Sequence, residues 1–171
     1  MRRTLDAFYG ALAWLAMLSM AATFVIIALG VLARQMQWNV QGLDGYAGYA
    51  IAAALFLALP STFQRNEHIR VTLLMEKAPP ATRRALQVWS LLAAGGISLL
   101  LTWFCARMVW FSYTTHDVAQ TMDATPLWLP QMGMAVGAAG LALACVDALV
   151  CHFAGRDFFK MTNAGEPARV E

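Results

Sequence analysis

The chain has 171 residues, of which 60% are hydrophobic and 13% are charged, and its formal net charge is +2. A soluble domain of this length still exposes about a third of its unfolded surface, so one small core cannot cover so much apolar side chain. Lipid must therefore solvate part of the chain. A net charge this small does not indicate a nucleic-acid partner, because orientation in the membrane explains it.

The chain contains four apolar stretches, each at or above the ~20 residues that a helix needs to cross the hydrocarbon of a bilayer. They are residues 10–33, 43–63, 86–110 and 127–153. We therefore predict an all-α membrane protein with four transmembrane helices, forming a single membrane domain over residues 1–171.

The basic residues predict the orientation of these helices. Ten of the twelve Lys and Arg lie in residues 2–3, 65–84 and 156–169. Alternating helices place all three regions on one side of the membrane, and an excess of positive charge marks the cytoplasmic side. We expect both termini in the cytoplasm. Residues 161–171 are polar, and we expect a disordered tail there.

The N-terminus also resembles a signal peptide, because basic residues precede an apolar run. However, residues 10–33 are about twice as long as the apolar part of a cleaved signal, and no small-residue cleavage pattern follows. We interpret this stretch as a retained helix. Cys105, Cys145 and Cys151 fall in or at the ends of predicted spans without a Cys-x-x-Cys pair, which indicates buried packing residues.

Charged residues flank the second and third helices. Asp44 stands in the first turn of the second helix, where the helix dipole favours a carboxylate, and capping explains it as well as a functional role does. Arg107 lies near the outer end of the third helix, where it can extend to the headgroups. We therefore expect both at the membrane surface.

The connection between the second and third helices is the most distinctive segment. Residues 67–77 read EHIRVTLLMEK, so charged residues flank a group of apolar side chains that can face the membrane. This pattern predicts a short interfacial amphipathic helix. Glu67 and Arg70 lie on one side of such a helix, where they can pair with each other, contact a partner subunit or lipid headgroups, or remain in solvent.

Small residues in the third and fourth helices indicate close packing between helices. Gly95 and Gly96 form a pair near the middle of the third, and Gly133, Gly137 and Gly140 form a stripe in the fourth. Such residues let two backbones approach closely in lipid.

Nothing in the sequence predicts catalysis or transport by this chain alone. Asp44, Arg107, Asp147 and His152 all map near predicted helix ends, whereas a functional site in the bilayer needs ionisable groups at depth. The three histidines are not placed to ligate haem, and the first helix lacks the acidic residue that a small antiporter would require. We expect no enzyme activity, catalytic residue, metal, cofactor or substrate site, and hence an accessory subunit.

The chain resembles the small membrane subunit (the four-helix, Q-type small permease) of tripartite ATP-independent periplasmic (TRAP) transporters. The resemblance rests on motifs in a fixed order: an arginine and an asparagine after the first helix, an acidic entry to the second, a His-Ile-x-Val stretch, and TPLWLPQMGMAVG at the start of the fourth. In this chain they are Arg34, Asn39, Asp44, residues 68–71 and residues 125–137. The chain departs from the family's pattern at two places. It has one acidic residue, Asp44, at the entry to the second helix, where the family often has two. It has Thr72 where the family often has an aspartate.

The resemblance implies a heterodimer with a large membrane subunit that holds the substrate and sodium sites, together with a periplasmic substrate-binding protein. This chain would stabilise and anchor the large subunit's scaffold in the bacterial inner membrane during sodium-coupled uptake of an organic anion such as a carboxylate or sugar acid. The expected contacts with the partner or with membrane lipids come from six residues: Arg34, Asp44, Arg65, Glu67, His68 and Arg70. The alternative is a self-contained, homo-oligomeric small transporter or membrane enzyme, in which the glycine stripes would join identical copies.

Overall fold

A computed structural model describes residues 2–38, 40, 42–65, 79–119 and 124–154. This part of the chain forms four α-helices and no strand: α1 (Arg2–Gln35), α2 (Leu43–Gln64), α4 (Pro80–Thr114) and α5 (Trp128–Phe153). All four are long and apolar enough to cross a membrane, which confirms the predicted all-α class with four membrane-length helices. The predicted interfacial helix at 67–77 and the tail at 161–171 lie outside the described residues.

Two of the helices are much longer than their apolar stretches. α1 has 34 residues and α4 has 35, which corresponds to about 51 and 52 Å at the helical rise. Hydrocarbon is about 30 Å thick, so both helices extend beyond it or tilt within it. Hydropathy locates only the part of a helix in lipid, which is why the apolar stretches at 10–33 and 86–110 are shorter than α1 and α4.

Local sequence explains where two helices begin. Gly42 precedes α2 with a φ of 87°, a left-handed conformation that costs glycine little. α4 begins at Pro80, directly after Pro79. Proline suits the first position of a helix because its fixed φ is already helical and its missing N–H would have no partner there.

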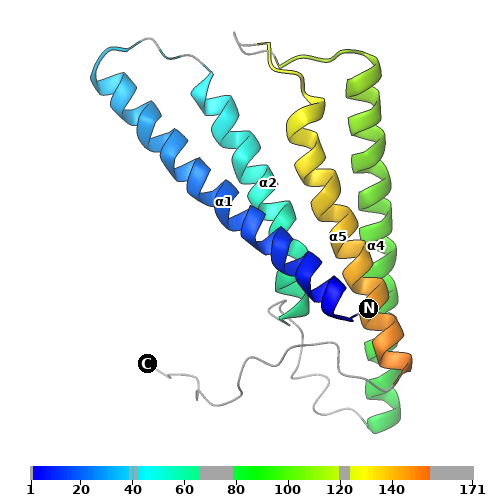
Figure 1. The fold of residues 1–171 in the computed structure, drawn as a ribbon. Helices are drawn as coiled ribbons and strands as arrows, with labels where there is room; N and C mark the ends of the chain where they lie inside the picture. Colours follow the sequence, from blue (N-terminus) through cyan, green and yellow to red (C-terminus); the bar gives the residue numbers. More distant parts are fainter. Residues whose placement is uncertain (1, 39, 41, 66–78, 120–123, 155–171) are drawn as a thin grey trace, which may run out of the picture.

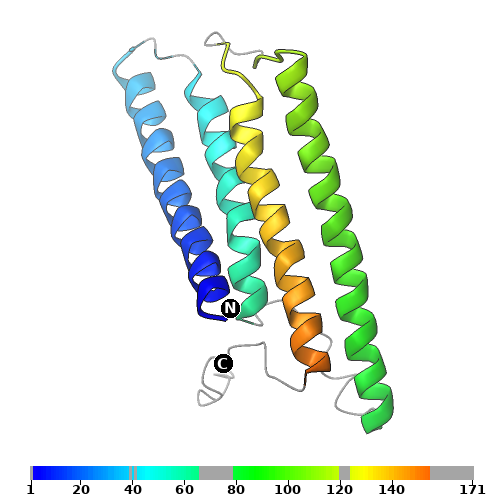
Figure 2. The same cartoon turned by 45° about the vertical axis from the view of Figure 1, so that its right-hand side comes forward.

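The helices pack side by side in the order α1, α2, α5, α4, with α2 and α5 in the middle (Figures 1 and 2). In the view of Figure 1, the α1–α2 hairpin is tilted relative to the α4–α5 hairpin. α1 reaches α5 only weakly, and its main contact is with α2. The bundle is therefore a row of two hairpins joined along α2 and α5.

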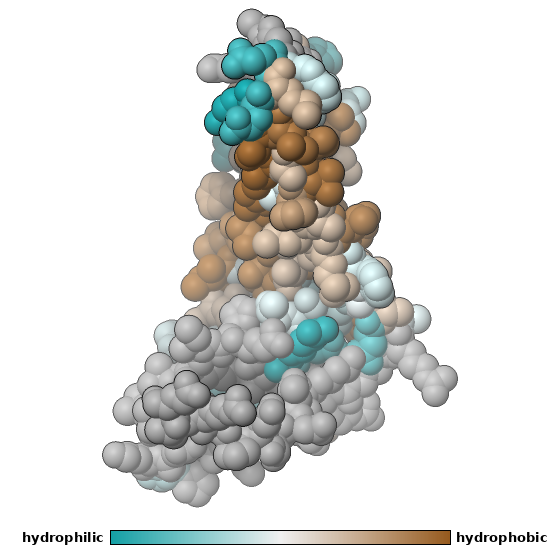
Figure 3. Space-filling model, turned by 90° about the vertical axis from the view of Figure 1, so that its left-hand side faces the viewer, coloured by the Kyte–Doolittle hydropathy of each residue, from teal (hydrophilic) through white to brown (hydrophobic). Residues whose placement is uncertain are grey.

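Burial follows this order. In the most apolar part of α5, 44% of the residues are buried, against 11% in α1 and 17% in α4. The outer helices carry large exposed apolar side chains, including Trp14 and Phe24 on α1 and Trp103 on α4. Seen from the α1 side, the surface is a hydrophobic band between hydrophilic ends (Figure 3). Such a surface requires lipid or an apolar partner around it.

Candidate functional site

The glycine stripe of α5 lies directly against the backbone of α2. A Cβ added at Gly137 would collide with the carbonyl group of Phe56 and come within 2.8 Å of the Leu57 nitrogen. One added at Gly140 would lie 2.8 Å from the ring of Pro60. At Gly133 the nearest atom would be the Ala53 Cβ, at 3.2 Å. The three glycines therefore follow one α2–α5 seam, in which the absence of side chains brings two backbones together.

The two glycines of α4 differ from each other. A Cβ at Gly95 would lie 3.9 Å from the Cβ of Cys145, an ordinary contact, whereas one at Gly96 would meet nothing within 4 Å. Gly95 therefore lies on the side of α4 that packs against α5, and Gly96 is exposed. A packing role for Gly96 would need an atom from outside the described chain.

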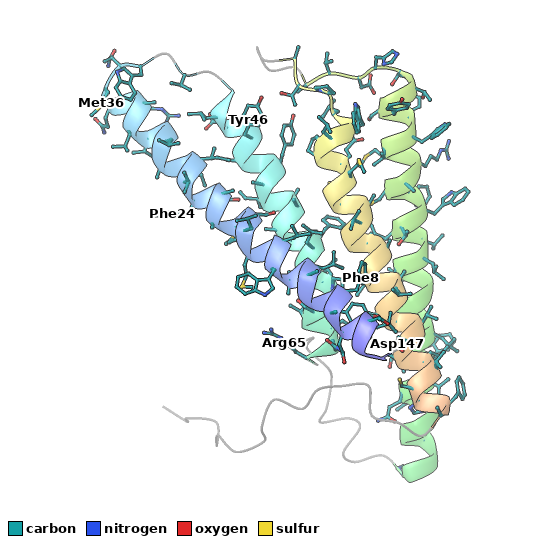
Figure 4. All side chains as sticks on the ribbon, in the orientation of Figure 1. Phe8, Phe24, Met36, Tyr46, Arg65 and Asp147 are labelled. Carbon is teal, nitrogen blue, oxygen red and sulfur yellow. The ribbon has the colours of Figure 1, made fainter. Side chains whose placement is uncertain are left out.

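A polar cluster joins three helices at the end of the bundle where α1 begins and α2 ends. The amide nitrogen Nε2 of Gln64 donates a hydrogen bond of 2.6 Å to Oδ1 of Asp6. Gln64 is buried, with 8% of its surface exposed. Asp147 of α5 lies beside the first turns of α1 (Figure 4), and its carboxylate accepts a 3.8 Å contact from the thiol of Cys151.

Tyr9 stands at the centre of this polar cluster. Its side chain is only 1% exposed and packs among Phe63 of α2 and several small residues of α5. The carboxylates of Asp6 and Asp147 lie near its hydroxyl, and no described residue forms a hydrogen bond with it. Tyr9 thus brings the start of α1 against both central helices.

This cluster was not predicted from the sequence. It assigned Asp147 separately to a helix end and did not consider Asp6, Tyr9 or Gln64. The one available signal was the presence of a polar residue near the same end of three predicted spans. Which of these residues share a face depends on helix rotation, which hydropathy alone does not give.

The opposite end of the bundle holds two of the six residues that were predicted to contact a partner or lipid. Arg34 lies in the last turn of α1 and Asp44 in the first turn of α2, and both are exposed. Each charge has the sign that its helix end favours. Neither forms an ion pair within the described part of the chain. Both are therefore accessible at the surface.

The loop before α5 is tied to α2 at this end. The Tyr46 hydroxyl (labelled in Figure 4) and the Thr125 hydroxyl are 2.9 Å apart, within hydrogen-bonding distance. Across the loop, the Ala119 nitrogen donates to the Thr125 carbonyl at 2.8 Å. The rings of Tyr113 and Trp128 meet edge to face, with centroids 5.8 Å apart. These contacts hold the ends of α4 and α5 against α2.

Arg65 caps the other end of α2 and is exposed. Glu67, His68 and Arg70 lie outside the described residues, so their predicted contacts with a partner or with lipid remain predictions. Cys105, Cys145 and Cys151 are buried and form no disulfide among the described residues, in line with their predicted packing role.

Two buried hydroxyls, those of Thr23 and Ser98, form hydrogen bonds within their own helix. Thr23 donates to the carbonyl of Ser19 at 2.9 Å, and Ser98 donates to that of Gly95 at 2.9 Å. Such bonds satisfy each hydroxyl within its own helix, as lipid requires. Among the described residues, no three His, Cys, Asp or Glu side chains are grouped closely enough to hold a metal ion.

These features define a polytopic membrane protein whose polar contacts and broad apolar flanks suit assembly with other components. Residues 23–155 match the family described as tripartite ATP-independent periplasmic transporters, DctQ component. The chain belongs to this family, which comprises the small membrane component of TRAP transporters. No curated protein and no solved structure matched the chain. Membership makes the protein a multi-pass transport component and implies association with a large membrane component and a periplasmic binding protein.

Proposed function

We propose that this chain is the accessory half of a heterodimeric permease, and that it anchors and widens the scaffold of the large membrane subunit. The observation that carries the proposal is the exposure of large apolar side chains along α1 and α4, on both flanks of the row. A flat row of four helices offers wide side surfaces and little enclosed volume. Such a shape suits a brace beside a larger protein.

The substrate and sodium sites belong, on this proposal, to the large subunit. The buried Thr23 and Ser98 hydroxyls bond to their own helix backbone, which favours a structural part for this chain. The transported solute is an organic anion such as a carboxylate or sugar acid, delivered by the periplasmic binding protein and driven by sodium. The α5 glycines already pack on α2 of the same chain, so they give no support to a homo-oligomeric transporter.

Reconstitution tests this division of labour. We expect liposomes that contain this chain alone to show no sodium-dependent uptake of labelled carboxylates or sugar acids. Co-reconstitution with the large membrane subunit and the binding protein should restore uptake of one of them. Sodium-driven uptake by this chain alone would contradict the proposal.

In the same complex, Arg70→Glu should lower recovery of the large subunit, whereas Arg169→Glu should not. Equal recovery of the large subunit with both variants would contradict a docking role for Arg70.

The proposed orientation places both termini in the cytoplasm of a bacterial inner membrane. Thr82 and Thr115 stand near opposite ends of α4 and are exposed, so they form a matched pair of labelling positions. In a variant without the three native cysteines, a membrane-impermeant maleimide should label Thr82→Cys only from the cytoplasm and Thr115→Cys only from outside. The reverse pattern would show that the bundle is inverted.

A further inference from the structure

A groove between α1 and α2 runs toward the end of the bundle that holds the polar cluster around Tyr9. Its base is made of small side chains, Ala13 and Ala16 from α1 and Ala54 and Ala58 from α2. Met17, Met20 and Leu55 form its rim, and all three are more than half exposed. It encloses about 320 Å³. The alanines have short side chains where the two helices face each other, so they leave a groove between the longer methionine and leucine side chains.

The groove has one polar end. Ser61 and Arg65 close it at the C-terminus of α2, whereas the rest of its lining is apolar. The Arg65 side chain extends from the end of α2, away from α4 and α5 (Figure 4). It forms no ion pair with another described residue. A groove that is apolar along its length and ends at a guanidinium is complementary to a phospholipid, whose chains are apolar and whose phosphate is anionic.

The length of the groove corresponds to one leaflet. Ala54 and Arg65 are eleven residues apart on α2, which is about 16 Å along the helix. Half of a hydrocarbon core is about 15 Å. The groove therefore extends from headgroup level, at Arg65, to about the middle of the bilayer, the depth of one acyl chain.

The volume of the groove favours a lipid chain over a protein helix. A helix about 10 Å across would occupy about 1,200 Å³ over the same 16 Å. The space of about 320 Å³ can hold only part of such a cylinder. One flexible chain can follow the whole groove while its headgroup remains at the surface.

We infer that the α1–α2 groove is a binding site for one anionic phospholipid of the leaflet on the Arg65 side. One acyl chain lies over the four alanines, and the phosphate pairs with the Arg65 guanidinium. The bound lipid fills the space between α1 and α2 and fixes the angle at which these two helices cross. This inference does not depend on what the transporter carries.

Native mass spectrometry of the full chain in detergent tests the site. With added palmitoyl-oleoyl phosphatidylglycerol, we expect a one-to-one adduct that is stronger than the adduct with the phosphatidylcholine of the same chains. Arg65→Gln should weaken the phosphatidylglycerol adduct about fivefold, the factor for one basic side chain near an anionic lipid surface. Arg107→Gln removes an exposed charge on α4, outside the groove, and should leave the adduct unchanged.

A second pair of variants tests the acyl channel. Ala13→Leu places bulk in the groove and should reduce the adducts of both lipids, whereas Ala21→Leu, exposed on the same helix outside the groove, should reduce neither. A benzophenone side chain introduced at Met20 should crosslink to lipid in native membranes. Equal phosphatidylglycerol binding by wild type and Arg65→Gln, or crosslinking at position 20 to a protein, would overturn the inference.

Discussion

Replacing Gly137 by alanine should destabilise the folded chain by about 2 kcal/mol, because overpacking a close contact typically costs 1–3 kcal/mol. The new Cβ would overlap the carbonyl group of Phe56, which is backbone and cannot rotate away. The two central helices would have to separate along the whole α2–α5 seam. Thermal unfolding of the purified chain in detergent measures the loss.

The neighbouring glycines give the prediction a rank order. At Gly140 the colliding atoms belong to Pro60 and to the flexible end of Leu12, so alanine should cost less than at Gly137. At Gly133 the contact of 3.2 Å with the Ala53 Cβ needs only a small shift, and the effect should be smallest. Gly96→Ala is the matched control: with nothing within 4 Å, it should be neutral or stabilising by about 0.5 kcal/mol. Equal effects at Gly96 and Gly137 would refute close packing at the seam.

Gln64→Met should destabilise the end of the bundle where α1 begins and α2 ends by about 1.5 kcal/mol, near the upper limit measured for hydrogen bonds between membrane helices. Methionine retains the length of the side chain but removes the amide that donates to Asp6 at 2.6 Å. The acceptor is a carboxylate, and hydrogen bonds to charged groups are stronger than neutral ones. The same unfolding measurement reports the effect.

Gln87→Met is the control for this substitution, since Gln87 is half-buried in α4 and no other described residue bonds to its amide. It should change stability by less than about 0.5 kcal/mol. A double variant with Asp6→Asn should lose less stability than the sum of the two single changes, because both substitutions act on the hydrogen bond between Gln64 and Asp6. Strictly additive losses would mean that the two side chains stabilise the fold independently.

Hydropathy and charge by themselves determined that the chain has four membrane-length helices, because the free energy of burial in lipid depends on composition over about 20 residues and needs no tertiary information. The motif order determined the family resemblance, which the match over residues 23–155 confirms. The same pattern could not give the ends of α1 and α4, since polar turns outside lipid continue a helix without any hydropathy signal. The stripe at Gly133, Gly137 and Gly140 predicted close packing against another helix but did not identify which helix.

Only the tertiary structure decided which faces meet. It places the α5 glycines against α2 of the same chain, leaves Gly96 open, and gathers Asp6, Tyr9, Gln64 and Asp147 from three helices into one cluster. A helix in lipid is apolar on all sides, so its sequence carries little information about its rotation. Rotation is set instead by short-range packing and by a few polar contacts between residues far apart in the chain, such as the 58 positions that separate Asp6 from Gln64.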